Sequence, residues 1–548
     1  MTKKGSFLLA LVALFFVGIE GHAKNRSNLG VETTFLVQQT DSLAADSLYR
    51  QALASIDQQD LQSAYHLVNA AIAADEGKPD YWKLLLQIQN HGGDPEGSAR
   101  TLARLIALEP TERQHYLDRG FVLAYMGNFD ESLQQYEQLT QKLGKDDQVF
   151  TAIATVYRMM DDQPAAIAEL ESLLRQGTDK SIAYVMLGEL YLEEDNISQA
   201  EDVLGRGLNK FPEDPLLQIG MADALKAQGK IAEAFAYLSK GFNSEHLDLD
   251  YRSGLLYRSL EEGVYDRQDI LALADSLVDN YPADPRSHAV RGDINSQLGA
   301  LVEARISYLK ALEINRYIPA IWQQLIFLSF MNEDWKEAQQ TGRRAVELFP
   351  NDPDLLFYTG NAYMMEKRNE EARPFLEAAL NNAQPENEGF LSMVYGGLGG
   401  IYHALGMYAE SDVAFKESLA IDSLDTFSLN NYAYYLAERN ENLAEAKRMS
   451  ALTLELSPNN SNSEDTYAWI LYKMGEYKEA LNWIKRAVKN DLNDPSAVLL
   501  EHYGDILYRN GKTRDAVSQW KNALKAVDVK DESFDRLNRK IQERRIVE

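Results

Sequence analysis

Apolar residues recur along most of the chain with the spacing of amphipathic helices. The stretches 184–215 (YVMLGELYLEEDNISQAEDVLGRGLNKFPEDP) and 321–353 (IWQQLIFLSFMNEDWKEAQQTGRRAVELFPNDP) share one layout: an aromatic start, a leucine, a short polar turn, two small residues and a proline. Apolar positions at i, i+3, i+4 and i+7 form a single stripe on a helix. Each stretch therefore predicts two helices joined by a tight turn, the second of which ends before a proline.

The first of the two small residues returns with a nearly constant period. Seven of the thirteen spacings between its occurrences are 34 residues. A small side chain at this point allows the two helices of a pair to cross closely. Because one pair cannot bury its apolar face alone, we expect neighbouring pairs to stack. The sequence thus predicts an all-α solenoid of about fourteen helix–turn–helix units, with the small position at Ala64, Ala99, Ser132, Ala166, Ala200, Ala234, Ile270, Ala304, Ala338, Ala372, Ser411, Ala446, Ala480 and Ala516.

This period and these residue types resemble the tetratricopeptide repeat family over about residues 46–526. The resemblance implies that the first helix of each pair lines a concave groove that holds peptide or helical segments of partner proteins. It implies no cofactor. The groove positions of the last three units give the partner-binding candidates Phe427, Asn430, Tyr434, Trp469, Tyr472, Asp505, Tyr508 and Arg509, and earlier units add Phe327, Phe330, Phe357, Asn361, Met364, Phe121 and Tyr125.

The chemistry of these positions favours a particular class of partner. Aromatic rings bury much area at low entropic cost, and asparagine can bond the amides of an extended peptide. A branch of the family holds C-terminal carboxylates with lysine and arginine, whereas the matching positions here carry Asn430, Asp465, Glu501 and Asp505. We therefore expect a neutral or basic protein partner. The alternative, that the rings pack between helices, stays open, because the period alone does not separate the two.

Irregularities in the repeat predict its subdivision. The unit around Ile270 lacks the small residue, and the step from Ala372 to Ser411 is 39 residues with an acidic insertion. The expected segments are a flexible stretch at 24–44, an N-terminal array at 45–283 with a degenerate last unit, a C-terminal array at 284–527, and a solvated capping helix at 528–548.

The N-terminus predicts export. Two lysines precede an apolar run at 7–19 and small residues at Gly21 and Ala23, which is the layout of a signal peptide at 1–23. The segments 430–488 and 500–524 resemble the C-terminal part of envelope repeat proteins from Bacteroidetes-type bacteria, which suggests the periplasm, with peripheral attachment to outer-membrane complexes. The chain has no cysteine, so a lipid anchor, disulfides and thiolate metal sites are excluded.

Other candidate chemistry is weak. Gly511-Lys512-Thr513 resembles the end of a phosphate-binding loop, but it falls in the turn of the last unit and lacks the earlier glycine that such a loop needs. The net charge of −28 disfavours nucleic-acid binding. Glu501, His502 and Asp505 share one helix turn, a poor geometry for a metal site. The glycines of GGLGG (396–400) are expected to permit close helix packing, or alternatively to leave room for a ligand backbone.

The leading hypothesis is therefore a non-catalytic scaffold of the bacterial cell envelope that binds other proteins, with its oligomeric state undetermined. Two alternatives remain. One is an envelope carbohydrate-active enzyme on a helical-repeat scaffold, although the repeats leave no unassigned block large enough for a catalytic domain. The other is a structural protein that assembles with copies of itself.

Overall fold

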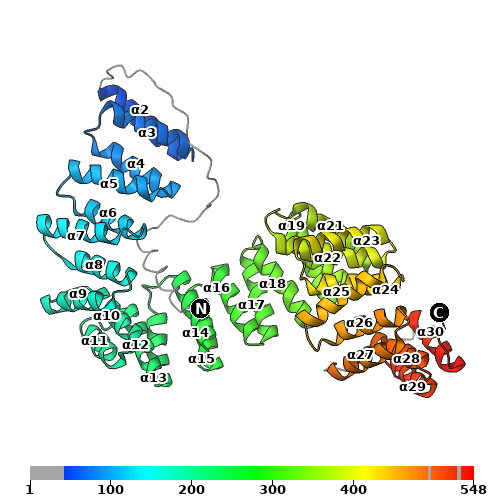
Figure 1. Cartoon of the computed structure of the whole chain (residues 1–548). Coiled ribbons are helices and arrows are strands. Elements are labelled where there is room, and N and C mark those ends of the chain that lie inside the picture. Colours follow the sequence, from blue (N-terminus) through cyan, green and yellow to red (C-terminus); the bar gives the residue numbers. More distant parts are fainter. Residues whose placement is uncertain (1–41, 492–494, 528–531, 548) are drawn as a thin grey trace. The chain divides into compact units, whose positions relative to one another are not determined.

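The computed structural model describes residues 42–491, 495–527 and 532–547 (Figure 1). These residues form 29 helices and contain no strand. The predicted all-α helical-repeat solenoid of about fourteen pairs is confirmed: fourteen consecutive pairs are followed by one further helix. The predicted signal peptide and most of the predicted flexible segment lie outside the described residues, although the first helix already begins at Ser42.

The helices of the first seven pairs alternate along the chain. They are α2 (Ser42–Asp57), α3 (Leu61–Ala74), α4 (Pro79–Gly92), α5 (Pro95–Leu108), α6 (Arg113–Tyr125), α7 (Phe129–Leu143), α8 (Asp147–Met159), α9 (Gln163–Gln176), α10 (Ile182–Glu193), α11 (Ile197–Lys210), α12 (Pro215–Ala227), α13 (Ile231–Phe242), α14 (Leu249–Glu262) and α15 (Arg267–Asn280).

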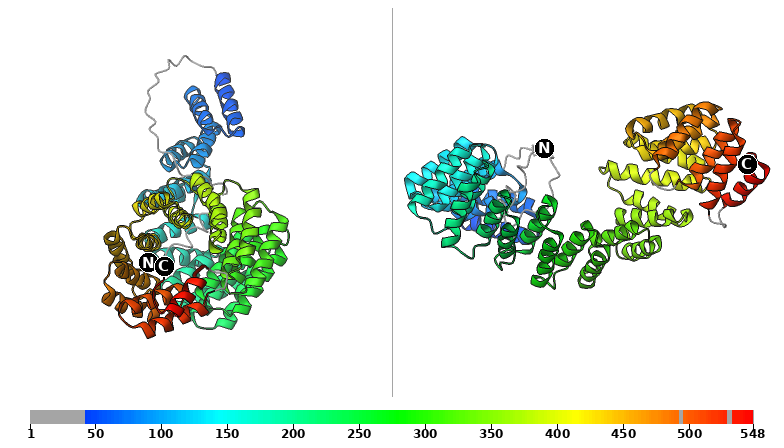
Figure 2. Two further views of the ribbon diagram at one scale, coloured as in Figure 1. Left: turned by 90° about the vertical axis from the view of Figure 1, so that its right-hand side faces the viewer. Right: turned by 90° about the horizontal axis from the view of Figure 1, so that it is seen from below.

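The remaining pairs continue the pattern, which Figure 2 shows from two further directions. They are α16 (Pro285–Gln297), α17 (Leu301–Ile314), α18 (Pro319–Met331), α19 (Trp335–Leu348), α20 (Pro353–Met365), α21 (Asn369–Asn382), α22 (Glu388–Ala404), α23 (Tyr408–Ile421), α24 (Thr426–Glu438), α25 (Leu443–Leu456), α26 (Ser461–Lys473), α27 (Tyr477–Asn490), α28 (Ala497–Arg509) and α29 (Thr513–Lys525), followed by α30 (Glu532–Glu543).

Proline and aspartate set the boundaries between pairs. Helix α11 ends at Lys210, and Pro212 follows its cap residue directly. Helix α12 then begins at Pro215, and the Asp214 carboxylate accepts the backbone N–H groups of Leu216 and Leu217. Proline suits the first helical position because its missing N–H would have no partner there, and the aspartate satisfies the free amides of the first turn.

Small residues let the two helices of a pair approach, as predicted. All fourteen tracked positions are 7% exposed or less. A second small position, on the first helix, faces a large side chain of the second helix. The six pairs with glycine there are Gly120–Tyr136, Gly188–Leu204, Gly292–Tyr308, Gly360–Leu376, Gly399–Phe415 and Gly504–Trp520, and a Cβ atom at any of these glycines would lie under 3.0 Å from the facing side chain.

The ninth pair reverses the sizes at these two positions. Its first helix carries Ile326, which is fully buried, where six other pairs carry glycine. Its second helix carries Gly342 where those six pairs carry a large residue, and a Cβ there would strike Thr359 of the next pair. The space between the two helices of a pair is therefore filled by one large residue, which can lie on the first helix or on the second helix but not on both.

The turn between α28 and α29 contains the Gly-Lys-Thr stretch. Gly511 has φ of 76°, in the left-handed region that glycine adopts without strain, and its N–H bonds the carbonyl of Tyr508. The segment before it is a helix and not the strand that a phosphate-binding loop requires. Gly511 therefore ends a helix, as the repeat register predicts.

The chain divides into two compact units, residues 1–269 and 270–548. The boundary between the two units falls inside α15, at Ile270, where the sequence shows a lapse in the repeat. The sequence instead predicts the boundary between the two arrays after residue 283. Within each unit, second helices pack on the first helix of the next pair, as α25 does on α26 and α27 on α28. First helices also contact each other, as in α10–α12, α18–α20, α22–α24 and α24–α26.

Helix α30 packs against the last pair. Leu537 is fully buried and belongs to the same apolar cluster as Trp520 and Leu507, with Ile541 and Ile546 beside it. Only 3% of Lys540 is exposed. The C-terminal helix thus caps the stack as expected, but one of its faces is buried, whereas the sequence predicts a solvated helix.

Candidate partner-binding face

Contacts between successive first helices define one continuous surface in the C-terminal unit. Helices α18, α20, α22, α24, α26 and α28 lie in sequence along it, each in contact with the next. We call this surface the first-helix face. All eight predicted partner-binding residues come from α24, α26 and α28, and they differ in how accessible they are on this surface.

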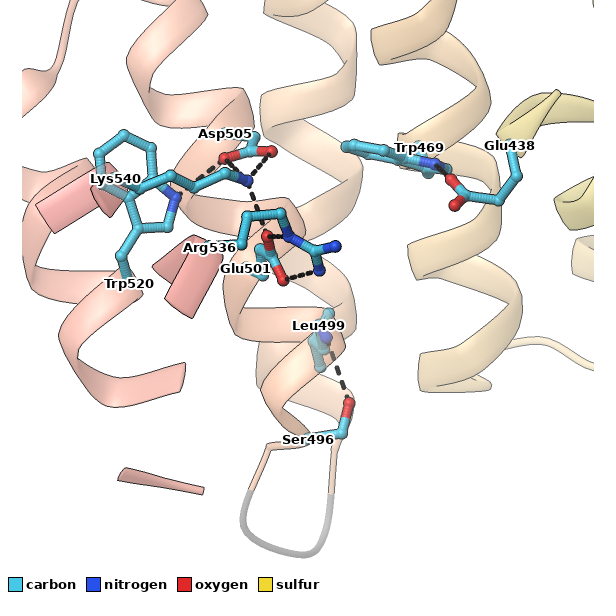
Figure 3. A network of polar contacts seen from close by, with 9 residues as sticks. All are labelled: Glu438, Trp469, Ser496, Leu499, Glu501, Asp505, Trp520, Arg536 and Lys540. Atoms are coloured by element: carbon cyan, nitrogen blue, oxygen red, sulfur yellow. Dashed lines mark hydrogen bonds and ion pairs between the residues drawn. The ribbon is translucent and has the colours of Figure 1, made fainter. Parts of the chain in front are cut away.

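Trp469 is buried within this surface (Figure 3). Only 7% of it is exposed, and its indole Nε1 donates a hydrogen bond of 2.6 Å to Glu438 Oε1 of α24. Its ring stacks on His502 of α28 at 4.0 Å between centroids and on Tyr472 at 4.6 Å. Trp469 therefore connects three first helices, and the predicted role as a free binding ring is wrong for this residue.

His502 completes this connection. Its Nδ1 lies 2.9 Å from Asp465 Oδ1 of α26. Burial opposes protonation of the imidazole, but the Asp465 carboxylate outweighs burial and raises the pKa of His502 above its usual value. The pairing also removes Asp465 from the set of acids that a basic partner could reach, and it gives His502 a structural partner rather than a metal ion.

The carboxylates of Glu501 and Asp505 are occupied by α30 (Figure 3). Arg536 donates to both oxygens of Glu501 at 2.8 Å, and Lys540 Nζ lies 2.7 Å from Glu501 Oε1 and from Asp505 Oδ2. Trp520 Nε1 donates a further bond of 2.9 Å to Asp505. Burial would raise the pKa of Glu501, but Arg536 and Lys540 outweigh it and hold that pKa below its usual range.

These contacts correct the prediction for Asp505. Its side chain is 6% exposed and already bonded to Lys540. The acids that the sequence assigns to recognition of a basic partner are thus neutralised within the chain. The sequence correctly predicts a cluster of acidic residues on the last first helix. However, the cations that pair with these acids lie about 35 residues later in the chain, on α30, which the sequence predicts to be a solvated helix.

The other candidates keep an accessible surface. Phe427 is 52% exposed, and Arg509 is exposed with its guanidinium 5.8 Å from the Tyr477 ring. Tyr434, Tyr472 and Tyr508 are half-buried, and burial raises the pKa of Tyr434 and Tyr472. Asn430 is half-buried, and its Oδ1 is shielded from solvent without a hydrogen-bond donor. The repeat period alone does not show whether a candidate residue is accessible or packs between helices, and the structure gives a different answer for each one.

Earlier pairs add accessible residues, and some of these are methionines that a search for aromatic residues misses. Phe327 is 52% exposed and Tyr125 is 66% exposed, whereas Phe357 is buried. Three methionines in the same register, Met331, Met365 and Met393, are each about half exposed. The repeat register could have identified them, because each occupies a groove position of its first helix.

The glycines of GGLGG serve close packing at most positions. A Cβ on Gly396 would strike Ser428, one on Gly397 would strike Leu376, and one on Gly399 would strike Phe415. Gly400 differs, because the nearest atom to its Cβ position is the Tyr435 hydroxyl at 3.7 Å. The packing interpretation holds for these three glycines, whereas a Cβ at Gly400 would meet its nearest atom at ordinary van der Waals distance.

Some first helices of the N-terminal unit are joined by ion pairs. Arg158 of α8 contacts Glu189 and Glu193 of α10 at 3.1 and 2.5 Å. Lys226 of α12 contacts Asp223 and, at 2.7 Å, Glu262 of α14. Burial raises the pKa of Glu189 to about 7, against the opposing effect of Arg158. Ion pairs therefore join α8 to α10 and α12 to α14.

The described part of the chain contains neither a candidate metal site nor a candidate membrane-spanning helix. No group of three or more His, Asp or Glu side chains there could hold a metal ion. None of the described helices combines the length and the apolar character that spanning a bilayer requires.

Comparison with known proteins agrees with this architecture. Two models of the tetratricopeptide repeat family match residues 159–224 and 331–388. This chain is a tetratricopeptide repeat (TPR) protein. A search of curated protein sequences gave no match for it.

Two solved structures show a low similarity to the TPR chain. A chain from the crystal structure of the APC/C hetero-tetramer Cut9–Hcn1 is 14% identical with a TM-score of 0.40, and the match covers 91% of this chain and 96% of that one. A tetratricopeptide repeat protein from Parabacteroides merdae is 16% identical with a TM-score of 0.32, covering 50% of this chain and 94% of that one.

Proposed function

We propose that this TPR protein is a non-catalytic scaffold that holds peptide segments of partner proteins on the first-helix face of its C-terminal unit. TPR proteins generally bind other proteins, and the TPR fold is typically a non-enzymatic scaffold. The observation that supports this face is the set of half-exposed apolar side chains on it, which includes Phe327, Met365 and Phe427. Exposed apolar groups gathered on one surface are typical of interaction sites.

Site-specific photo-crosslinking tests this proposal. A photoreactive phenylalanine analogue at Phe427 in the native host should capture one or a few proteins on illumination. The matched control is the same analogue at Val413, which is 59% exposed on second helix α23. Adducts that form equally from both positions, or from neither, would contradict the assignment of this face.

We further propose that the protein is exported to the periplasm of a Bacteroidetes-type bacterium, where its partners would be envelope proteins. The support is the sequence pattern of residues 1–23. Osmotic-shock fractionation with N-terminal sequencing tests this. Release with the periplasmic fraction and a mature N-terminus at Lys24 is expected, and retention of the full-length chain in the cytoplasm would contradict it.

Self-association is a second candidate function, favoured by one specific observation. Val302, Ile306 and Leu309 form an exposed apolar stripe on second helix α17, with exposed fractions of 68%, 58% and 39%. The same register positions of α19 are the polar residues Lys336, Gln340 and Arg343. Light scattering across a concentration range tests this: a mass that rises in the wild type but stays constant in Ile306→Lys would support self-association.

A further inference from the structure

His502 is a buried histidine at the junction of three first helices. Only 5% of it is exposed, and its ring stacks on Trp469 of α26 with 4.0 Å between centroids and 14° between planes. Its Nδ1 lies 2.9 and 3.1 Å from the two carboxylate oxygens of Asp465, also on α26. The ring of Tyr434 on α24 lies 6.0 Å away. One titratable ring therefore lies against both of the first helices that precede its own.

The charged groups packed around His502 and Trp469 balance only when the imidazole is protonated. They are the acids Glu438 of α24, Asp465 of α26, and Glu501 and Asp505 of α28, and the cations Lys473 of α26 and Arg536 and Lys540 of α30. Arg509, the other basic residue of α28, is exposed and lies over the Tyr477 ring at 5.8 Å. Burial raises the pKa of Tyr434 and Tyr472, so both hydroxyls stay uncharged near neutral pH. A protonated His502 thus supplies the missing positive charge.

The proton therefore strengthens the contact between α26 and α28. Burial disfavours the imidazolium, but Asp465, aided by Glu438 and Asp505, outweighs burial and raises the pKa of His502 above 6.5. A group of this kind contributes stability that is complete below pH 6.5 and is lost as the pH rises through its pKa in the fold. A neutral imidazole still donates one N–H to Asp465, but it no longer neutralises that carboxylate, which is 15% exposed. It also loses the attraction of a cation for the indole face.

The consequence of losing the proton falls on Trp469. Its ring contact to α28 is the stack on His502, and its Nε1 is bonded to Glu438 on the opposite neighbour, α24 (Figure 3). Leu471 of α26 and Ile506 of α28 belong to one buried apolar cluster that carries no titratable group. Weakening the His502 contact therefore produces a local opening at the first-helix face, while the cores of the two pairs stay packed.

We propose that His502 forms a proton-dependent contact between α26 and α28: its imidazolium keeps Trp469 covered, and loss of the proton opens the face locally and exposes the indole to solvent. The contact opens as the pH rises and closes again on acidification. This inference concerns the conformation of the chain itself and holds whether or not the first-helix face binds a partner.

Fluorine NMR of the full chain labelled with 5-fluorotryptophan measures the exposure of the indole. The signal of Trp469 is identified by its absence from Trp469→Phe. A soluble gadolinium chelate should broaden this signal at least about threefold more at about pH 9.5 than at about pH 5.5, because local opening brings the ring into contact with solvent. Trp520, which is fully buried, is the internal reference, and its signal should be broadened equally at both pH values.

Histidine NMR links this opening to one residue. The Cε1 signal of His502, absent from His502→Gln, should titrate with a midpoint above 6.5. Asp465→Asn should lower that midpoint by at least about one pH unit, because the main opposing charge is lost. His403 is the matched control: it stacks on Tyr435 at 3.8 Å, but burial and Arg439 lower its pKa, so it should titrate below 6.5 in both proteins.

Exposure of Trp469 should follow the titration of His502. In Asp465→Asn the pH at which the Trp469 signal becomes accessible should fall by the same amount as the His502 midpoint. In His502→Gln the accessibility of Trp469 should no longer depend on pH. Circular dichroism spectra of both variants should match the wild type, because the apolar cluster beneath the face is unchanged.

Each contrary result overturns the inference. A wild-type His502 midpoint below 6.5, or an accessibility of Trp469 that is the same at both pH values, would do so. So would a pH-dependent accessibility that persists in His502→Gln. If that variant does not fold, Asp465→Asn decides alone, since a Trp469 transition that stays in place while the His502 midpoint moves would separate the two events. No partner is present in these measurements, so the scaffold function is tested independently by crosslinking at Phe427.

Discussion

At the scale of single residues, the fold depends on pairs of small and large side chains facing each other between the two helices. Gly120 faces the ring of Tyr136, which is 2% exposed. The ring is held in place by a hydrogen bond from its hydroxyl to Leu117 O. A methyl group at this glycine therefore cannot be accommodated without moving a buried ring.

Substitution of this glycine should be destabilising. We expect Gly120→Ala to lower the free energy of unfolding by about 1–3 kcal/mol through overpacking. The matched control is Gly254→Ala in α14 of the same unit, which meets no atom within 4 Å and should instead stabilise by about 0.5–1 kcal/mol. Thermal unfolding followed by circular dichroism measures both, and shifts of the same sign would contradict this account.

A buried carboxyl makes the N-terminal unit sensitive to pH. The pKa of Glu189 is about 7 in the fold against a usual value of 4.5. Its contribution to stability is therefore complete below pH 4.5 and is lost as the pH rises through 7. Because the side chain is 16% exposed, we expect a loss on the order of 2 kcal/mol.

Glu189→Gln removes this titration and should melt at nearly the same temperature as the wild type at pH 5 but higher at pH 8. Glu193→Gln is the control, because Glu193 contacts the same Arg158 but is 39% exposed. Its melting temperature relative to the wild type should change less between the two pH values than that of Glu189→Gln, because Glu189 still titrates in this variant. Parallel behaviour of the two variants would refute the assignment to Glu189.

The sequence predicts most residue roles that depend on the repeat itself, such as the burial of Ala200 and Ala516. It does not predict the burial of Trp469, because that depends on His502 in the next pair and on Glu438 in the preceding one. The same register position carries the accessible Phe327 in α18. A single-repeat pattern contains no information on which neighbour will cover a ring.

At the scale of elements, α30 is attached through a buried ionic network. Lys540 is enclosed with Glu501 and Asp505, and all three are less than a tenth exposed. The charged sequence of α30 predicts a capping helix, but its partners are distant in the chain, so the sequence alone does not show that a lysine is buried.

Loss of Lys540 should therefore be costly. Lys540→Ala leaves two carboxylates with one cation fewer in a buried site, and we expect it to lower the free energy of unfolding by about 3–5 kcal/mol. The control Arg545→Ala removes a cation that is 66% exposed and should change stability by less than about 0.5 kcal/mol. Chemical denaturation monitored by tryptophan fluorescence compares them, and equal effects would rule out the buried network as an anchor.

At the scale of the whole molecule, helix pairs contact their immediate neighbours and the chain forms two compact units. In such an array stability is close to a sum of local terms, so unfolding of 548 residues as one cooperative step is not expected. The 34-residue period predicts this architecture from the sequence. The predicted export signal lies outside the described residues, so localisation stays a prediction.

Differential scanning calorimetry should resolve this independence. Gly120→Ala should lower the temperature of one component of the heat-capacity curve, and Lys540→Ala should lower the other. Each variant should leave the remaining component within about 1–2 °C of the wild type, since the altered contacts are local. A single transition that both variants shift alike would show that the two units unfold together.

The exchanged sizes of Ile326 and Gly342 limit how such a chain can diversify. Gene duplication or recombination that copies a complete helix pair carries the large residue and its small counterpart together. A crossover within the ninth pair would instead join two large residues, or two glycines, across one interface. Viable rearrangements of the gene should therefore have their breakpoints between pairs, and exchange of a single helix should require a compensating change in its neighbour.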